Sequence, residues 1–219
     1  MPKTLLALAL LAAASFADEP PARVGKTRGP AAVQPQGSGL FAPDPRPEGR
    51  RLDPGDRFRT LEGGYAHLAL PLGAVAALKP NTTLVLERAG TAAQAAVLEG
   101  DALFGLTRPL DRGWSLSVRV HGATAVAAGQ RRGAGAGPGF WAYCGPDREA
   151  RFAALAGTLR VRAEGRAVRL RAGQETRVPY GRPPSEPRPA RFPEGFVRTF
   201  AIAGSLSGAE EALGLAPAR

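Results

Sequence analysis

A β-hairpin is encoded most clearly at residues 159–171, which have the sequence LRVRAEGRAVRLR. On both sides of the turn Glu164-Gly165-Arg166, apolar residues alternate with arginine. Successive side chains of a strand point to opposite faces, so this period of two separates the apolar groups from the guanidinium groups. The pattern predicts strands over 159–163 and 167–171, with one face in a core and the other cationic.

Shorter runs of the same kind occupy most of the chain before this hairpin. They are rich in apolar and β-branched residues and are bounded by Gly, Pro and Asn, as is typical of short strands joined by turns. The expected strands are 65–70, 74–78, 82–87, 95–98, 102–106, 115–120, 124–127, 140–144 and 150–155, with a last one at 176–178. Because no helical period separates them, they predict an all-β fold, either a sandwich or a short solenoid-like stack of short antiparallel strands.

The N-terminus has the pattern of a secretory signal peptide. Lys3 supplies a positive charge, Leu5 to Ala14 form an apolar run, and Ser15-Phe16-Ala17 ends in small residues. We expect residues 1–17 to be removed by cleavage after Ala17, so that the protein is periplasmic or secreted and has no integral membrane span. An uncleaved signal anchor is the alternative.

The two segments that flank the predicted domain do not show the regular hydrophobic period of a strand or of a helix. Residues 18–54 are rich in Pro and Gly, which predicts a disordered linker, locally extended around Pro43, Pro45 and Pro47. Residues 179–219 form a Pro-rich tail in which 196–213 is weakly amphipathic and predicts a short C-terminal helix. Alternating glycines over 133–139 predict a mobile loop between two strands. The expected β domain therefore spans 55–178.

The charge balance favours an anionic partner. The net charge is +10 in 219 residues, and nearly all of the cations are arginine. An exported basic protein is attracted to anionic lipid headgroups, acidic glycans or other polymers of the envelope, whereas export separates it from nucleic acid. Cys144 is the single cysteine, so an internal disulfide is excluded. The sequence leaves the oligomeric state open.

The sequence contains no pattern typical of a catalytic or metal site. His67 and His121, the two histidines, are far apart in the sequence and belong to no metal-binding motif. Cys144 lies among aromatic residues and is expected to be a small buried hydrophobic group. We also expect the neighbouring Trp141 and Tyr143, together with Trp114, to point into the core. The protein is therefore predicted not to be an enzyme and to need no cofactor or metal.

Five short fragments resemble, in their order, the pattern of the periplasmic FecR-type domain. They lie across the region 55–178, and each is a strand end or a glycine turn. They are Leu70-Pro71-Leu72-Gly73, Asn81-Thr82-Thr83-Leu84, Leu98-Glu99-Gly100-Asp101-Ala102-Leu103-Phe104, Ala156-Gly157-Thr158-Leu159-Arg160-Val161 and Leu170-Arg171-Ala172-Gly173-Gln174.

The resemblance implies a periplasmic fold and a partner-binding role. Two features depart from the family pattern: Leu72 replaces an acidic residue, and Gly129-Gln130-Arg131-Arg132 matches the family's Gly-Thr-x-Phe element poorly. Members that transmit iron-uptake signals carry a cytoplasmic anti-sigma segment and a membrane helix before this domain. A secretory signal occupies that place here, so the resemblance does not imply control of a sigma factor.

The candidate binding site is the cationic face of the hairpin, formed by Arg160, Arg162, Arg169 and Arg171. Like charges facing each other across two strands are destabilising unless anions offset them, and guanidinium groups bind phosphate and carboxylate as a fork. We expect this face to bind an envelope protein or an anionic envelope polymer. The alternatives are a solvated face neutralised by Glu164 and Glu175, and a scaffold role in which an exposed edge strand pairs with a partner strand.

Overall fold

The computed structural model describes residues 22–106, 110–128, 139–192 and 195–200, which form β-strands joined by turns and two short 3-10 segments. The expected signal peptide and most of the glycine loop lie outside these residues, as does 201–213 of the expected helix. The strands are β1 (Ala22–Arg28), β2 (Ala31–Gln34), β3 (Ala42–Asp44), β4 (Arg51–Leu52), β5 (Arg57–Thr60), β6 (Tyr65–Leu70), β7 (Ala74–Leu78), β8 (Thr83–Arg88), β9 (Ala92–Leu106), β10 (Ser115–Val120), β11 (Ala123–Ala128), β12 (Gly139–Cys144), β13 (Ala150–Ala156), β14 (Thr158–Ala163), β15 (Arg166–Arg171), β16 (Gln174–Val178) and β17 (Arg188–Pro189). The 3-10 segments are η1 (Pro71–Gly73) and η2 (Phe196–Phe200).

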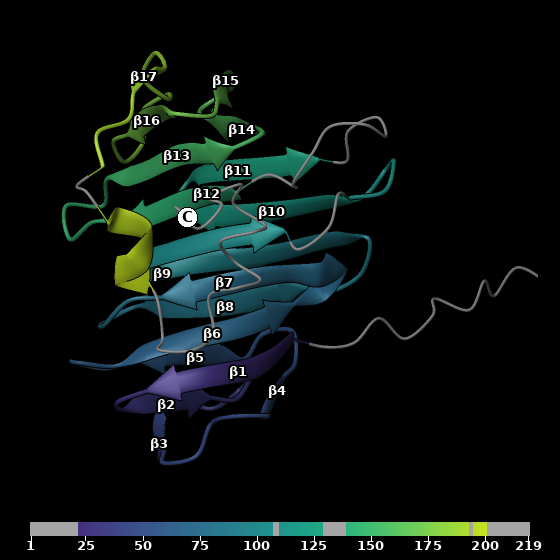
Figure 1. Cartoon of the computed structure of the whole chain (residues 1–219), viewed down its shortest axis with the longest axis vertical. Helices are drawn as coiled ribbons and strands as arrows, with labels where there is room; N and C mark the ends of the chain where they lie inside the picture. Colours follow the sequence, from purple (N-terminus) through teal and green to yellow (C-terminus); the bar gives the residue numbers. More distant parts are fainter. Residues whose placement is uncertain (1–21, 107–109, 129–138, 193–194, 201–219) are drawn as a thin grey trace, which may run out of the picture.

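The strands are stacked along the long axis of the molecule, with β1–β4 at one end and β14–β17 at the other (Figure 1). Their pairing forms two sheets. Sheet A has the order β4-β1-β6-β7-β9-β12-β13-β16-β17. Sheet B has the order β3-β2-β5-β8-β9-β10-β11-β14-β15. All of these pairings are antiparallel except the parallel one between β9 and β10, and the prediction of an all-β fold is confirmed.

The long strand β9 belongs to both sheets. Its first part pairs with β8 and β10 in sheet B, and from Gly100 onward it pairs with β7 and β12 in sheet A. The change occurs at Gly100, whose φ of +85° is unfavourable for residues with a side chain. A Cβ at this position would lie 2.5 Å from Thr82 Oγ1 and 2.6 Å from the carbonyl oxygen of Asn81. Glycine is therefore required where the strand crosses between the sheets.

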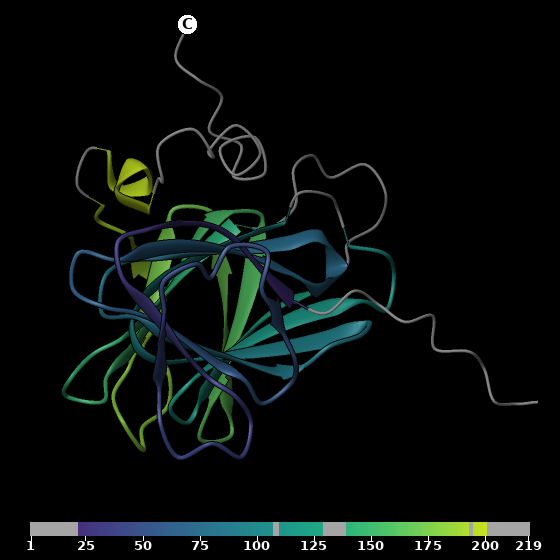
Figure 2. The ribbon, with the colours of Figure 1, turned by 90° about the horizontal axis from the view of Figure 1, so that it is seen from below.

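The hydrophobic core fills the space between the two sheets, so that the strands surround it in the view along the stack (Figure 2). Its largest fully buried side chains include four phenylalanines, of which Phe104 and Phe140 stack with ring centroids 5.1 Å apart. Alternate residues of the strands are buried, as the period-two pattern predicts. In the described part of the chain, no helix is long and apolar enough to cross a membrane.

The predicted hairpin is present as β14 and β15. Glu164 and Gly165 form its turn with φ values of +47° and +73°, the geometry of a two-residue type I′ connection. Arg166 belongs to β15 and not to the turn, because it pairs with Ala163. The turn type matches the right-handed twist of the strands, which stabilises the register that the sequence predicts.

The prediction of a disordered linker over 18–54 is wrong for residues 22–54. This segment forms β1 to β4, and Val24, Val33 and Leu52 are each 1% exposed in the core. Its strands pair with β5 and β6, so the domain includes residues well before 55. The sequence pattern is weak here because the inward residues are mostly small and the prolines interrupt the period, whereas distant strands supply the pairing.

The Pro-rich segment after β16 is also tied to the domain. The hydroxyl of buried Thr176 donates a hydrogen bond to the carbonyl of Ser185 at 2.7 Å, and β17 pairs with β16. Within the expected helix, the described residues Phe196–Phe200 form the 3-10 segment η2.

Replacing a buried leucine of the former linker tests its place in the core. We expect Leu52→Ala to lower the free energy of unfolding by about 2–5 kcal/mol, because it leaves a cavity in a closely packed core. Leu40→Ala is the matched control, since Leu40 is 79% exposed and its loss should change stability by less than about 0.5 kcal/mol. Urea denaturation measures both, and equal stabilities would contradict the ordered structure of this segment.

The crossing of β9 is tested by Gly100→Ala. We expect a loss of about 3 kcal/mol or more, because the methyl group adds a backbone clash to the strain of a positive φ. Gly49→Ala is the control for strain alone, since Gly49 has a φ of +80° and open space around its Cβ position. Its cost should be about 1–2 kcal/mol in the same denaturation assay, and equal losses would rule out the clash.

Candidate binding surface on the outer face of sheet B

The four predicted arginines lie together on the outer face of sheet B. All four side chains are exposed, whereas the alternate residues of β14 and β15 are buried in the core. Arg160 lies directly opposite Arg169 in the ladder, while Arg162 faces Thr124 on β11 and Arg171 faces Thr158. We call these four residues the arginine cluster.

The cluster lacks neutralising carboxylates among the described residues, where no ion pair joins any of its four members to Asp or Glu. Glu175 does not neutralise it, because its carboxylate accepts from Arg188 Nη2 at 2.7 Å. Other arginines of the same sheet are paired, such as Arg59 with Glu99 and Arg119 with Glu87. The direct opposition of Arg160 and Arg169 is thus repulsive, and a bound anion would relieve it.

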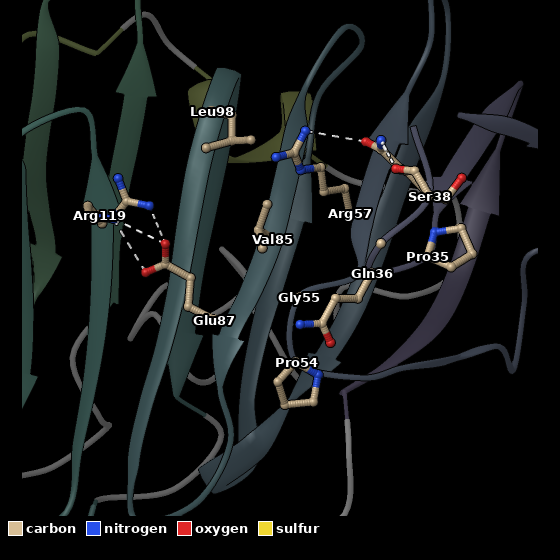
Figure 3. A pocket seen from close by; sticks show the side chains of 12 residues that line it. Pro35, Gln36, Ser38, Pro54, Gly55, Arg57, Val85, Glu87, Leu98 and Arg119 are labelled. Carbon is tan, nitrogen blue, oxygen red and sulfur yellow. Dashed lines mark hydrogen bonds and ion pairs between the residues drawn. The ribbon is translucent and has the colours of Figure 1, made fainter. Parts of the chain in front are cut away.

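A groove of about 590 Å³ lies farther along the same outer face (Figure 3). One wall is formed by the loop around Gln36 and the turn at Pro54-Gly55, and the other by Arg119 and Glu87. Val85 lies between them (Figure 3). The groove could not be predicted from the sequence, because one of its walls comes from the segment expected to be a linker.

Hydrogen bonds hold the charged groups of the groove in place. Gln34 is 9% exposed; its amide donates to the carbonyl of Ser38 at 2.6 Å, and its Oε1 accepts from Arg57 Nη1 at 3.3 Å. Across the groove, Arg119 Nε donates to Glu87 Oε1 at 3.1 Å. The hydrogen bond and charge of Glu87 raise the pKa of Arg119, although burial opposes this. Two guanidinium groups are therefore positioned on opposite sides of the groove.

The aromatic residues of β12 do not all point into the core as predicted. Phe140 is buried there, and Trp114 packs against the core, but Trp141 belongs to a separate cluster with Leu103 on the outer face of sheet A. Trp141 and Tyr143 stack at 5.7 Å, and the indole Nε1 donates to Asp101 Oδ1 at 2.8 Å. The reason is the alternation of the strand, which directs residues 141 and 143 away from residues 140, 142 and 144.

The outer faces of the two sheets differ in their covering. Phe192 and Phe196, from the C-terminal part of the described chain, contact Trp141 edge-on at 6.2 and 5.8 Å. Phe196 also lies under the ammonium group of Lys79 at 5.0 Å. The aromatic surface of sheet A is therefore covered by the protein's own chain, which leaves the outer face of sheet B as the better candidate binding surface.

The fold brings together Cys144 and His121, which are distant in the sequence. Cys144 Sγ lies 3.2 Å from His121 Nε2 and donates to the carbonyl of Leu98 at 3.0 Å. Burial, followed by the nearby Glu99 and Asp147, raises the pKa of the thiol to about 11, and burial lowers the pKa of His121. The thiol is thus protonated at neutral pH, so the pair lacks the thiolate that a nucleophile needs. Among the described residues, no group of three or more His, Cys, Asp or Glu could hold a metal ion.

Alkylation of the single cysteine tests this environment. At pH 8 we expect Cys144 to react with a maleimide roughly 100-fold more slowly in the folded protein than in guanidinium chloride, because only the thiolate reacts. The rate should rise as the pH increases towards the thiol pKa of about 11. Mass spectrometry at timed intervals measures the modification, and similar rates in both states would contradict the burial of the thiol.

Comparisons with known proteins give a likeness of fold. No protein-family model and no curated protein sequence matches the chain. Two crystal structures of a presumed anti-sigma factor from Parabacteroides distasonis superpose with TM-scores of 0.50, at 18% and 17% identity. The alignments cover 61% and 72% of this chain, and 59% and 74% of the other chains. This chain thus spans only about three fifths of the first structure. The likeness agrees with the fold implied by the FecR-type resemblance, and no family match establishes membership.

Proposed function

We propose that this protein is an exported, non-catalytic binding module of a bacterial envelope, which engages an acidic envelope protein or an anionic envelope polymer through sheet B. A sensing or regulatory role is consistent with the description of its structural neighbours as presumed anti-sigma factors. The N-terminal signal pattern supports the location, and the cationic face supports the choice of an anionic partner.

The observation that carries this proposal is the arginine cluster. Its four guanidinium groups are exposed on two adjacent strands, and Arg160 faces Arg169 while neither forms an ion pair with a carboxylate of the described residues. Such an arrangement is mildly unfavourable in the free protein and becomes favourable when phosphate or carboxylate groups bind. A merely solvated face would gain nothing from this arrangement.

A second candidate function is pairing with a partner strand. Within the described ladders β15 pairs with β14 alone, which makes its other edge the candidate for pairing with a strand from another protein. The two modes differ in their response to salt. Electrostatic binding weakens as ions screen the charges, whereas main-chain pairing persists.

Replacing the cluster by serine tests the proposed function. We expect the variant with serine in place of Arg160, Arg162, Arg169 and Arg171 to have an affinity for phosphatidylglycerol liposomes that is about 100- to 1000-fold lower in a sedimentation assay. The reason is that each basic residue near an anionic surface contributes ~1 kcal/mol to binding. The same variant should lose the acidic proteins that the wild type retains from envelope extracts at low salt.

The matched control removes four exposed arginines elsewhere, Arg23, Arg28, Arg46 and Arg182, whose side chains form no ion pair within the described residues. It has the same net charge as the cluster variant, so its liposome binding should fall by less than about threefold at physiological salt. Equal losses in both variants would show a general charge effect and would reject the cluster as the site. Binding by the cluster variant that survives high salt would favour strand pairing.

A further inference from the structure

The groove and the arginine cluster lie on one line across sheet B. The pairing registers place six residues side by side on successive strands, and all of them except the buried Ala96 are at least partly exposed. In order from β5 to β14 these are Arg57, Val85, Ala96, Arg119, Thr124 and Arg162. Three guanidinium groups therefore follow one another along a row that runs across the strands.

The length of this row matches a short extended chain. Neighbouring strands are about 4.8 Å apart, so Arg57 and Arg119 are separated by about 14 Å and Arg119 and Arg162 by about 10 Å. An extended peptide rises about 3.3 Å per residue, and seven or eight residues would span the row. Acidic side chains on such a peptide could reach all three arginines.

Contacts within the protein fix the wall of the groove around Gln36 and Gly55. The backbone N–H of Gln36 donates a hydrogen bond to Asp56 Oδ1 at 2.8 Å, and the backbone N–H of Gly55 donates one to the carbonyl of Leu86 at 2.7 Å. The Gln36 side chain packs on Gly55, where a Cβ would lie 2.6 Å from it. A preformed wall lowers the entropy cost of binding a flexible chain.

The lining of the groove favours a peptide over a sugar. Val85, Pro54 and the partly exposed Leu98 offer apolar contacts next to the two arginines, and none of the described residues that line the groove is aromatic. Sugar sites commonly use an aromatic face, whereas a peptide presents both carboxylates and apolar groups. The lining thus complements a segment in which acidic and apolar residues occur together.

Among the described residues that line the groove, Glu87 is the one carboxylate, and it is bound to Arg119. It holds the guanidinium group in place, but it also competes with an incoming carboxylate for the same donors. Removing its charge should therefore strengthen the binding of an acidic ligand, even though an intramolecular ion pair is lost.

We propose that the groove binds an extended acidic segment of a partner protein, seven or eight residues long, whose carboxylates contact Arg57, Arg119 and Arg162 in turn. This inference rests on the proposed function, because it specifies the chemistry of the acidic partner and the path that it takes across sheet B. An anionic polymer or membrane surface would need the arginine cluster alone and would be indifferent to the groove.

The test uses fluorescein-labelled octaglutamate and the full chain, with binding followed by fluorescence anisotropy in 150 mM salt, about physiological ionic strength. Arg57→Gln combined with Arg119→Gln should weaken binding by about tenfold or more, because two charge-assisted contacts are lost. Arg23→Gln combined with Arg28→Gln removes the same charge from exposed positions on β1 and should change binding by less than about twofold. Glu87→Gln should bind octaglutamate more tightly than the wild type. Circular dichroism melts verify that each variant is folded.

Each contrary result has a defined meaning. Equal losses in the two double variants, or no loss in the groove variant, would overturn the inference. So would a wild type that binds phosphatidylglycerol liposomes but not octaglutamate, and in that case the proposed function would stand. If the wild type binds neither probe and retains no acidic envelope protein, both proposals fail. Weaker binding by Glu87→Gln would overturn the assigned role of this carboxylate.

Discussion

The joining of the two sheets depends on one buried hydroxyl group, which accepts one hydrogen bond and donates another. Thr82 Oγ1 accepts from the amide of Asp101 at 3.0 Å and donates to its carbonyl at 3.1 Å, next to Gly100 with its positive φ. Thr60, also fully buried, bonds in turn to the amide of Thr82 at 3.0 Å. These contacts hold β9 where it leaves sheet B and enters sheet A. Because one strand serves both sheets, the core is continuous along the stack.

The outer faces acquire different chemistry from the same alternation of side chains. On sheet A, Trp141 is covered by Phe192 and Phe196 of the chain itself. On sheet B, the outward positions of β14 and β15 carry exposed arginines. A large aromatic surface is costly to leave in water, whereas guanidinium groups are well solvated. The two faces therefore differ in their covering: one is packed against the C-terminal segment, and the other keeps its arginines exposed.

The arginines of this protein are distinguished by their neighbours and not by their exposure. Arg119 is oriented by Glu87, and Arg57 by the amide of Gln34. Arg160 and Arg169 face each other, and in the part of the chain that the structure describes neither has an ion-pair partner. Oriented cations on a preformed groove confer geometric selectivity, while a cluster of unpaired cations contributes long-range attraction. Both properties on one face would allow a partner to be attracted first and then positioned.

The sequence by itself determined the hairpin, the all-β class and the cationic face of β14 and β15, because these follow from the alternation of neighbouring residues and from a two-residue turn. Only the tertiary structure decided that 22–54 is part of the domain, since Val24 and Leu52 are buried through the pairing of β1 with β4 and β6. It also decided the groove, the covering of Trp141 and the contact between Cys144 and His121. Each of these joins residues far apart in the chain, and such contacts depend on the register of distant strands, about which local alternation carries no information.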